Sequence, residues 1–487
     1  MSRTRRAGSV AGVLLVLGAV YLIAWGTQAG SPRPAAAATA TAPVTSVDRS
    51  CPPPGPNTGE ASVATVAADS SGTSAGKSST TALTAIGDST QGADSTVTTS
   101  SKPNAPQLLP APQPSAFGAT KVSVSGAAAA GFEAELATSA GVGTVTCGHP
   151  ESVAWFVGLG TATGASSITA YLSNTGVMPA DTELTIWTDA GPQPGTNVTV
   201  PAHQYLSVNL ASLVQGSQVM AVQVQTSSGQ VGANVWEAGG SGGAWLPQAV
   251  APATQVVIPG LTAQANSGKL LVAVPGGTDA EVKVTAVTAQ GTQQPFGATA
   301  QDAPSAAGSV FSLGSLASSA SALVLTSNVP ITAAVQIPGS GVGGFTAATA
   351  PVSEQGVVAG NPSGGDTVGV VLSAPGAGAR VTVTTIPASG PGTSGSGTSG
   401  SAGEASRTVT VAPGRSVATT VAAPRGGDRF AIVVTPQRGS GPVYAARIVT
   451  SGGSGLSGQI VSVLPVASAP TSVQLPPADN SYTAVLP

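Results

Sequence analysis

An internal repeat of about 100 residues recurs from Ser152 onward, and self-similarity at a fixed period indicates a tandem architecture. Each copy has an apolar segment that ends in a turn, at Asn174, Pro275 and Pro375, followed by a segment in which apolar and polar residues alternate. Such alternation is typical of β-strands with one buried face. We therefore expect repeated β units, the alternative being chance convergence of Val/Thr/Gly-rich sequence.

Composition favours the same fold class. The chain has 64 Gly and 39 Pro, few aromatic residues, and many Val and Thr residues between the Gly and Pro positions, a pattern typical of strands and turns. Charged residues make up only 8 %, and the net charge is −3. A surface that tracks nucleic-acid phosphates needs clustered Lys and Arg, so we predict an all-β protein with no nucleic-acid partner.

Each repeat holds six or seven short strands, which predicts β-sandwich-like units. Two segments at the carboxyl end, 471–475 and 482–486, resemble the opening strand of a further unit. The segment 121–136 resembles the tail of a unit whose beginning is missing. We expect these ends to pair and leave no exposed edge, which also suits the alternative of a β-propeller-like ring.

The amino terminus has the pattern of a membrane signal-anchor. Arg3, Arg5 and Arg6 precede an uncharged run from Ala7 to Trp25, close to the roughly 20 residues that a helix needs to cross a bilayer. Arginines on the amino side predict that the chain after Thr27 lies outside the cell membrane. The alternative is a signal peptide cleaved near 35–38, which would release a secreted protein.

Two cysteines, Cys51 and Cys147, are expected to face an oxidising compartment and to form a disulfide. The bond would close a loop of about 95 residues and contribute roughly 4–5 kcal/mol in the chain-entropy model. The alternative is two separate buried thiols.

These patterns divide the chain into seven segments. They are a cytoplasmic region 1–6, a transmembrane anchor 7–26, an Ala/Pro/Thr-rich spacer 27–59, an amino-terminal β segment 60–150 with a disordered insertion 70–117, and β units at 151–250, 251–350 and 351–487, the last with a Gly/Ser insertion 390–403 and closing carboxyl-terminal strands.

Catalytic chemistry has little support in the sequence. The only imidazoles are His149 and His203, and the G-x-S-x-G match around Ser241 lies in a Gly/Ser loop without the helix that a nucleophile elbow needs. Cys147 and His149 are too few for a structural zinc site. We predict a non-enzymatic protein with no catalytic residue, cofactor or metal.

Aromatic residues are the best sequence indication of a binding surface. They concentrate in or near the first unit, and Trp155, Trp236 and Trp245 are candidate ligand contacts because indole faces stack on sugar rings. Trp245, in a Gly-rich segment, is the one most expected to be exposed. The alternative is that all three belong to the core.

Several motifs resemble one actinobacterial domain family of unknown function, found in large membrane-anchored or secreted proteins. They are the exported amino end, Cys51-Pro52, a second cysteine before Val153–Gly158, the strand–Asn/Pro–Gly turns, and Val198–Ala202. The resemblance runs from Cys51 to the end of the chain, with the Gly/Ser insertion and the loss of aromatics as departures in the third copy. It implies a location outside the membrane and no assigned activity or site.

These observations together predict a membrane-anchored extracytoplasmic protein of the cell envelope that acts as a scaffold or binding module. The alternative is a glycan-binding accessory protein, or a degenerate glycan-active enzyme of cell-wall polysaccharide metabolism. The expected partners are the membrane, through the amino-terminal helix, and a cell-wall glycan or other envelope proteins.

Overall fold

The computed structural model describes residues 41–55, 61–68, 79–88, 96–110, 118–138, 144–240, 242–261, 267–297, 299–313, 321–339, 342–388, 405–424, 429–452, 456 and 459–475. These residues form strands and two short 3-10 turns, so the all-β prediction is confirmed. No helix in these ranges is long and apolar enough to cross a membrane. The expected anchor, 7–26, lies outside the described residues, as does the insertion 390–403.

The chain divides into two compact units. The main unit, Pro43–Thr471, contains four repeats of similar construction. The first repeat comprises β2 (Ser46–Cys51), β3 (Ala61–Ala67), β4 (Ser79–Ile86), β5 (Thr96–Ser101), β6 (Gln107–Pro110), β7 (Ala119–Ser125), β8 (Phe132–Thr138) and β9 (Val145–Thr146). The second comprises β10 (Val153–Leu159), β11 (Ser167–Ser173), β12 (Ala180–Thr188), β13 (Gly191–Val200), β14 (Tyr205–Asn209), β15 (Val219–Ser228), β16 (Gly232–Gly239) and β17 (Gly242–Leu246).

The other two repeats follow directly. The third comprises β18 (Ala253–Leu261), β19 (Lys269–Val274), β20 (Ala280–Thr288), β21 (Gly291–Gln293), β22 (Gln301–Ala303), β23 (Ala307–Ser312), β24 (Ser321–Ile337) and β25 (Gly344–Ala347). The fourth comprises β26 (Gly356–Pro362), β27 (Asp366–Ala374), β28 (Ala379–Pro387), β29 (Ala405–Val411), β30 (Arg415–Val421), β31 (Arg429–Pro436), β32 (Tyr444–Ser451) and β33 (Gln459–Pro465).

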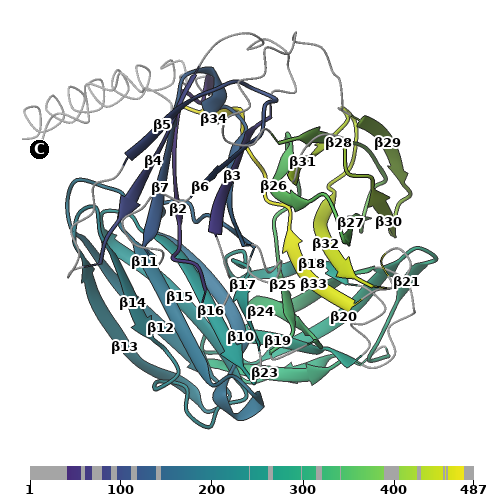
Figure 1. The fold of residues 1–487 in the computed structure, drawn as a ribbon. Helices are drawn as coiled ribbons and strands as arrows, with labels where there is room; N and C mark the ends of the chain where they lie inside the picture. Colours follow the sequence, from purple (N-terminus) through teal and green to yellow (C-terminus); the bar gives the residue numbers. More distant parts are fainter. Residues whose placement is uncertain are drawn as a thin grey trace, which may run out of the picture. The chain divides into compact units, whose positions relative to one another are not determined.

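All four repeats share one antiparallel topology. In the second repeat, one sheet has the strand order β10-β15-β12-β13 and the other the order β14-β11-β16-β17 (Figure 1). The first repeat has β2-β7-β4-β5 and β6-β3-β8-β9, and the fourth has β26-β31-β28-β29 and β30-β27-β32-β33. In the third repeat the long strand β24 runs through both sheets, pairing with β18 and β20 along one part and with β19 and β25 along the other.

The amino-terminal part of this pattern differs from the sequence expectation. Residues 60–150 hold most of a complete repeat rather than the tail of one, and β4, β5 and β6 lie within 70–117, which was expected to be a disordered insertion. Likewise, β1 (Thr41–Pro43) and β2 fall inside the expected spacer 27–59. Ser and Thr dominate β4 and β5, so their composition is that of a loop while their cross-strand pairing is that of a sheet.

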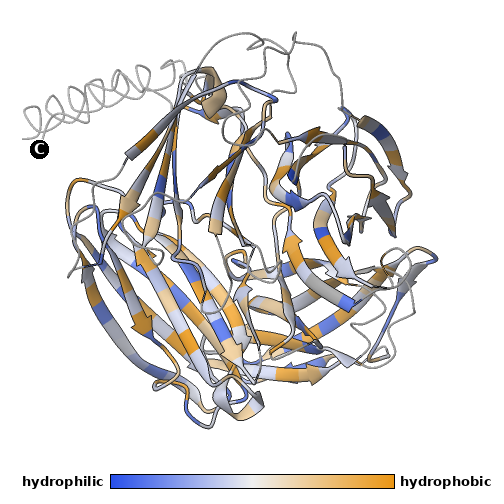
Figure 2. Ribbon diagram, viewed as in Figure 1, coloured by the Kyte–Doolittle hydropathy of each residue, from blue (hydrophilic) through white to orange (hydrophobic). Residues whose placement is uncertain are grey.

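Strands bury alternate residues because successive side chains point to opposite faces. In β12, Asp181 and Glu183 are exposed while Leu184 and Ile186 are fully buried. Apolar residues recur along the strands of every repeat in Figure 2. In the fourth repeat the two sheets enclose a core of Val, Leu, Ile, Ala and Phe side chains, the arrangement of a β-sandwich.

The four repeats contact one another in cyclic order within the main unit. Four apolar clusters each join neighbouring repeats: first with second, second with third, third with fourth, and fourth with first. At the last junction the Gln355 side chain donates a 2.6 Å hydrogen bond to the Ala68 carbonyl, and Gly131 N–H donates to the Pro470 carbonyl. Gly131 has a φ of 66°, and a Cβ there would overlap Gln355 and Ala68, so this position requires glycine.

The prediction that the carboxyl-terminal segment pairs with 121–136 is wrong. The segment expected to pair with 121–136 forms β34 (Ser472–Gln474), which pairs with β1. The first repeat needs no strand from the carboxyl end because β2 already pairs with β7 along Ser46–Cys51. The segment 482–486 lies outside the described residues.

Candidate functional site

A cavity of about 520 Å³ lies in the main unit where all four repeats contribute residues. Its walls come mostly from the segments that follow the last strand of each repeat. From β9 and the linker after it come Val145–His149 and Glu151, and from the end of β17 and its linker come Leu246–Ala251. Thr349 and Ala350 follow β25, and Leu464, Pro465, Ala467 and Ser468 lie at and after the end of β33. Val153, Trp155, Phe156 and Asn234 complete the lining. A volume of this size is typical of small-ligand sites.

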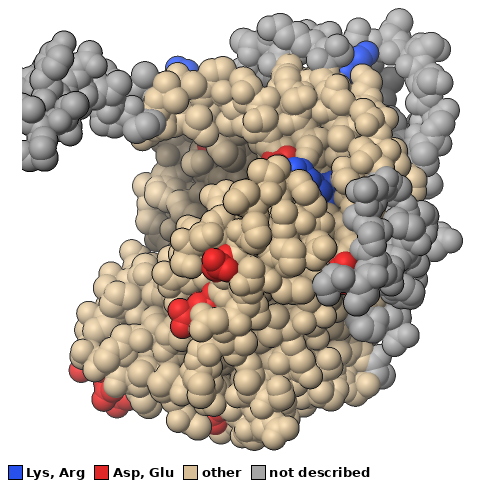
Figure 3. Space-filling view, turned by 90° about the vertical axis from the view of Figure 1, so that its left-hand side faces the viewer, with Lys and Arg blue, Asp and Glu red and all other residues tan. Residues whose placement is uncertain are grey.

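The wall is mainly apolar, and its ionisable side chains, His149 and Glu151, both come from the linker after the first repeat. Glu151 accepts a hydrogen bond from the Gln248 amide, and Asn234 Nδ2 donates to the Thr146 carbonyl at 3.1 Å. His149 Nε2 lies 3.5 Å from Glu133 Oε1, behind the cavity wall. Charged side chains are sparse on the protein surface as well, as Figure 3 shows for one face.

Glu133 connects His149 to a buried ion pair. Arg49 Nε lies 2.8 Å from Glu133 Oε1, and both side chains are almost fully buried. The guanidinium also donates to the carbonyls of Phe132 and Asp48. Burial alone would raise the pKa of Glu133, but Arg49 and then His149 outweigh it, so the pKa lies below its usual value. Glu133 is therefore an anion in the folded protein at neutral pH.

Glu151 is the other carboxylate near His149. Burial raises its pKa, opposed by the hydrogen bond from Gln248 and by the charge of His149. The order Arg49, Glu133, His149, Glu151, Gln248 thus forms a polar row from the interior of the first repeat to the cavity wall. Of these residues, only His149 was singled out from the sequence. Glu151 is two residues further along the chain, but no local pattern shows that Arg49 and Glu133 lie behind them.

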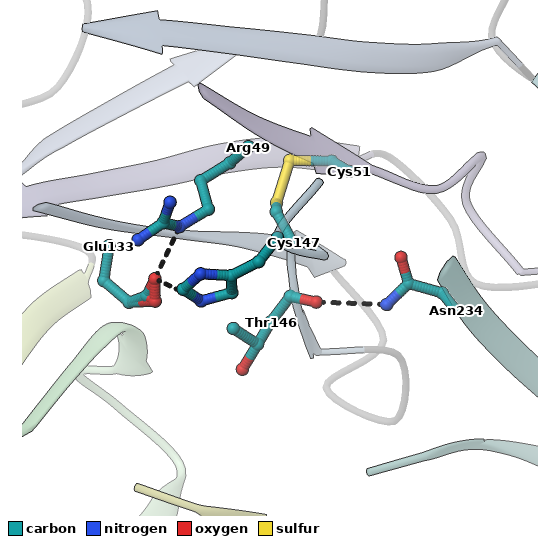
Figure 4. The surroundings of a disulfide bond; sticks show 7 residues. Arg49, Cys51, Glu133, Thr146, Cys147 and Asn234 are labelled. Carbon is teal, nitrogen blue, oxygen red and sulfur yellow. Dashed lines mark hydrogen bonds and ion pairs between the residues drawn. A yellow bond between two sulfur atoms is a disulfide. The ribbon is translucent and has the colours of Figure 1, made fainter. Parts of the chain in front are cut away.

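The predicted disulfide between Cys51 and Cys147 is confirmed. Cys51 ends β2 in one sheet of the first repeat, and Cys147 follows β9 in the other sheet. Figure 4 shows Arg49 and Glu133 beside this bond, with the Asn234–Thr146 hydrogen bond on its other side. Because Cys147 is oxidised, it cannot act as a nucleophile or a metal ligand. The disulfide holds the cavity segment that carries His149.

The three candidate tryptophans are buried, which supports their core interpretation. The exposed fractions are 5 % for Trp155, 3 % for Trp236 and 7 % for Trp245. Trp245 was expected to be exposed, but β17 pairs with β16 and places it against Trp236 and the disulfide. Trp155 stacks on Trp187 with ring centroids 5.2 Å apart. Of the three, Trp155 lines the large cavity.

The other sequence candidates lie apart from this site. His203 occupies a turn with a φ of 55°, and Ser241 lies outside the described residues. Among the residues that are described, no group of three or more His, Cys, Asp or Glu side chains is arranged to hold a metal ion.

Comparison with known proteins identifies a family without an assigned activity. A sequence model described as a family of unknown function, DUF5719, matches residues 97–399, which include the second and third repeats and parts of the first and fourth. No curated protein matches the chain.

Proposed function

The chain belongs to DUF5719, a family of unknown function. We propose that it is a non-enzymatic binding module of the cell envelope and that its ligand site is the four-repeat cavity. Residues 7–26 anchor it in the cell membrane, and the chain that follows lies outside. The actinobacterial origin implied by the sequence resemblance is part of the same proposal.

The cavity carries the argument for binding. Linkers from four separate repeats converge on it, so a ligand seated there contacts every repeat at once. The polar side chains are few, as in sites that use an apolar wall for affinity and a few hydrogen bonds for orientation. With Cys147 tied in a disulfide and His149 directed to Glu133, the wall supports recognition better than nucleophilic chemistry.

A cell-wall glycan is the second candidate ligand. The amides of Asn234 and Gln248 and the indole of Trp155 line the same cavity, and such side chains bind hydroxyl groups and sugar rings. This alternative makes the protein a glycan-binding accessory factor, or a degenerate glycan-active enzyme.

The test is retention of envelope material by the full-length protein before and after the cavity is filled. Ala350 lines the cavity and is exposed, so Ala350→Trp fills it without entering a sandwich core. We expect saturable retention of a solubilised envelope extract by the wild-type protein and loss of most of it, about tenfold or more, in this variant.

The matched control is Ala190→Trp, which adds the same side chain at an exposed position in the turn after β12. Equal retention by Ala350→Trp and wild type would contradict the cavity as the site. Purified peptidoglycan and polysaccharide, used as separate baits, distinguish the glycan alternative from other ligands.

A further inference from the structure

We propose that the cavity binds a ligand with one protonated amine attached to an apolar body, the amine lying against Glu151 and the apolar part against the Trp155–Phe156 side. This inference rests on the proposed function, since it names the ligand class of the same cavity.

The four repeats provide an internal comparison for the cavity wall. After its last strand, each repeat forms one bridge back to its own first strand: Gly148 with Ser50, Ala249 with Trp155, Thr349 with Val257, and Ser468 with Gly356. These four bridges define structurally equivalent positions along the linkers.

The residue after the bridge differs in one repeat. It is Val250, Ala350 and Ala469 in the last three repeats but His149 in the first. Three positions after the bridge, the first repeat has Glu151 where the others have Pro252, Val352 and Thr471. At these two positions the other three linkers have no ionisable side chain. The pair in the first repeat therefore marks one side of the cavity for polar recognition.

Charge balance decides the sign of the ligand. Arg49 and Glu133 neutralise each other at 2.8 Å, and the nearby Asp48 is paired with Lys121 at 3.1 Å. Glu151 is the one acidic side chain among the described residues that line the cavity. Its partner, Gln248, is a neutral donor. The described wall thus presents one carboxyl group, Glu151, whose hydrogen-bond partner is neutral, while the His149 imidazole faces Glu133 at 3.5 Å. A carboxylate placed in this way favours a cationic group on the ligand.

The apolar part of the cavity wall favours an apolar body for the rest of the ligand. Phe156, Leu246, Leu464 and several Val, Ala and Pro residues line most of the cavity. A saccharide would leave several hydroxyl groups against these apolar side chains without hydrogen-bond partners, at about 1–3 kcal/mol each. An amine with an aromatic or aliphatic body has a single polar end to satisfy and buries the rest.

Binding of matched small probes to the full-length protein tests this inference. We expect phenethylamine to bind about tenfold more tightly than phenethyl alcohol at neutral pH, measured by ligand-observed NMR titration. Glu151→Gln should reduce this preference to about twofold or less while leaving the affinity for the alcohol unchanged. Glu183→Gln, at an exposed position of β12, is the matched control and should retain the preference.

The dependence on pH gives an independent readout. The ionisable groups around the amine site are Glu151 and His149, with Glu133 and Arg49 behind them. Acidification protonates Glu151, whose pKa is raised by burial, so amine binding should weaken as pH falls while alcohol binding stays constant. A dipeptide that begins with phenylalanine carries the same protonated amine, and its N-acetylated form does not. We expect the dipeptide to bind more tightly than the acetylated form; equal binding of the two would contradict recognition of the amine.

The outcomes separate this inference from the proposed function. Equal binding of amine and alcohol, with both lost in Ala350→Trp, would overturn the amine assignment and retain the cavity as a binding site. Binding of both probes that is indifferent to Ala350→Trp, or no binding of either, would overturn both.

Discussion

At the scale of single residues, Glu237 is the clearest departure from ordinary burial. It lies on β16 with no exposed surface, accepts a 3.1 Å hydrogen bond from Leu159 N–H, and has no partner for Oε1. Burial raises its pKa well above the usual value, and the single backbone hydrogen bond opposes this only partly. A Cβ at Gly158 would come within 2.5 Å of Oε2, so glycine makes room for this carboxyl group.

Glu237 should therefore make the protein less stable as pH rises. The pKa of Glu237 is higher in the folded than in the unfolded protein. The free energy of unfolding is therefore unaffected below about pH 4.5 and falls as pH rises towards the folded pKa. The total fall is about 1.4 kcal/mol for each tenfold difference between the two acid dissociation constants. Glu237→Gln should remove this loss and be more stable than wild type at pH 8. Urea denaturation at pH 5 and pH 8 measures it, with the exposed Glu183→Gln as control. Parallel pH dependences in wild type and Glu237→Gln would contradict this.

At the scale of elements, the first repeat is held together differently from the others. Its last strand, β9, has two residues, whereas β17, β25 and β33 have five, four and seven. So short a strand gives few ladder hydrogen bonds, and the Cys51–Cys147 disulfide joins its exit to β2 of the opposite sheet. The covalent bond fixes the linker that carries His149 in place of a longer strand.

Removal of this bond should destabilise the protein substantially. The double variant Cys51→Ala/Cys147→Ala should lose about 2–5 kcal/mol of unfolding free energy, because the bond closes a loop of 96 residues in the unfolded chain. Denaturation with and without a thiol reductant measures the effect. Reductant should lower the midpoint of the wild type and leave the double variant unchanged. Equal midpoints for the oxidised wild type and the variant would contradict this account.

At the scale of the main unit, the junction between the first and fourth repeats contains a buried carboxyl group as well as an apolar cluster. Between the first and fourth repeats, Glu135 accepts hydrogen bonds from Ala359 N–H at 2.9 Å and Gly360 N–H at 3.0 Å. These amides lie where the β26–β31 register shifts, so the carboxylate replaces missing ladder partners. Arg429 crosses the same junction and donates to the carbonyls of Thr138 and Gly360.

This junction should depend on Glu135 more than on any exposed acid. Glu135→Ala leaves two buried N–H groups without acceptors, and we expect a loss of about 3 kcal/mol or more. Hydrogen exchange should accelerate at Ala359 and Gly360, and little in β12 of the second repeat. Glu281→Ala, at an exposed position of β20, is the control. Unchanged protection at both amides would show that the apolar cluster alone closes the junction.

The fold class, the internal repeat and the disulfide could all be predicted from the amino-acid sequence. Alternation along segments such as Glu183–Trp187 and turns at Asn174, Pro275 and Pro375 are local signals, so strands and repeat spacing were readable from neighbouring residues. Two cysteines allow one intramolecular pairing. Burial of Trp245 was not readable, because its Gly-rich surroundings resemble a loop and its cover comes from β16 and the first repeat.

The number of repeats and the position of the cavity became clear from the three-dimensional packing. The strands β4 and β5 are Ser/Thr-rich; β5 pairs with β4, and β4 pairs on its other edge with β7, which follows two further strands along the chain. The polar row joins Arg49, Glu133 and His149 from three separate segments, and the cavity joins linkers about 100 residues apart. Proximity of this kind is created by the packing of repeats, which no local pattern of residues specifies.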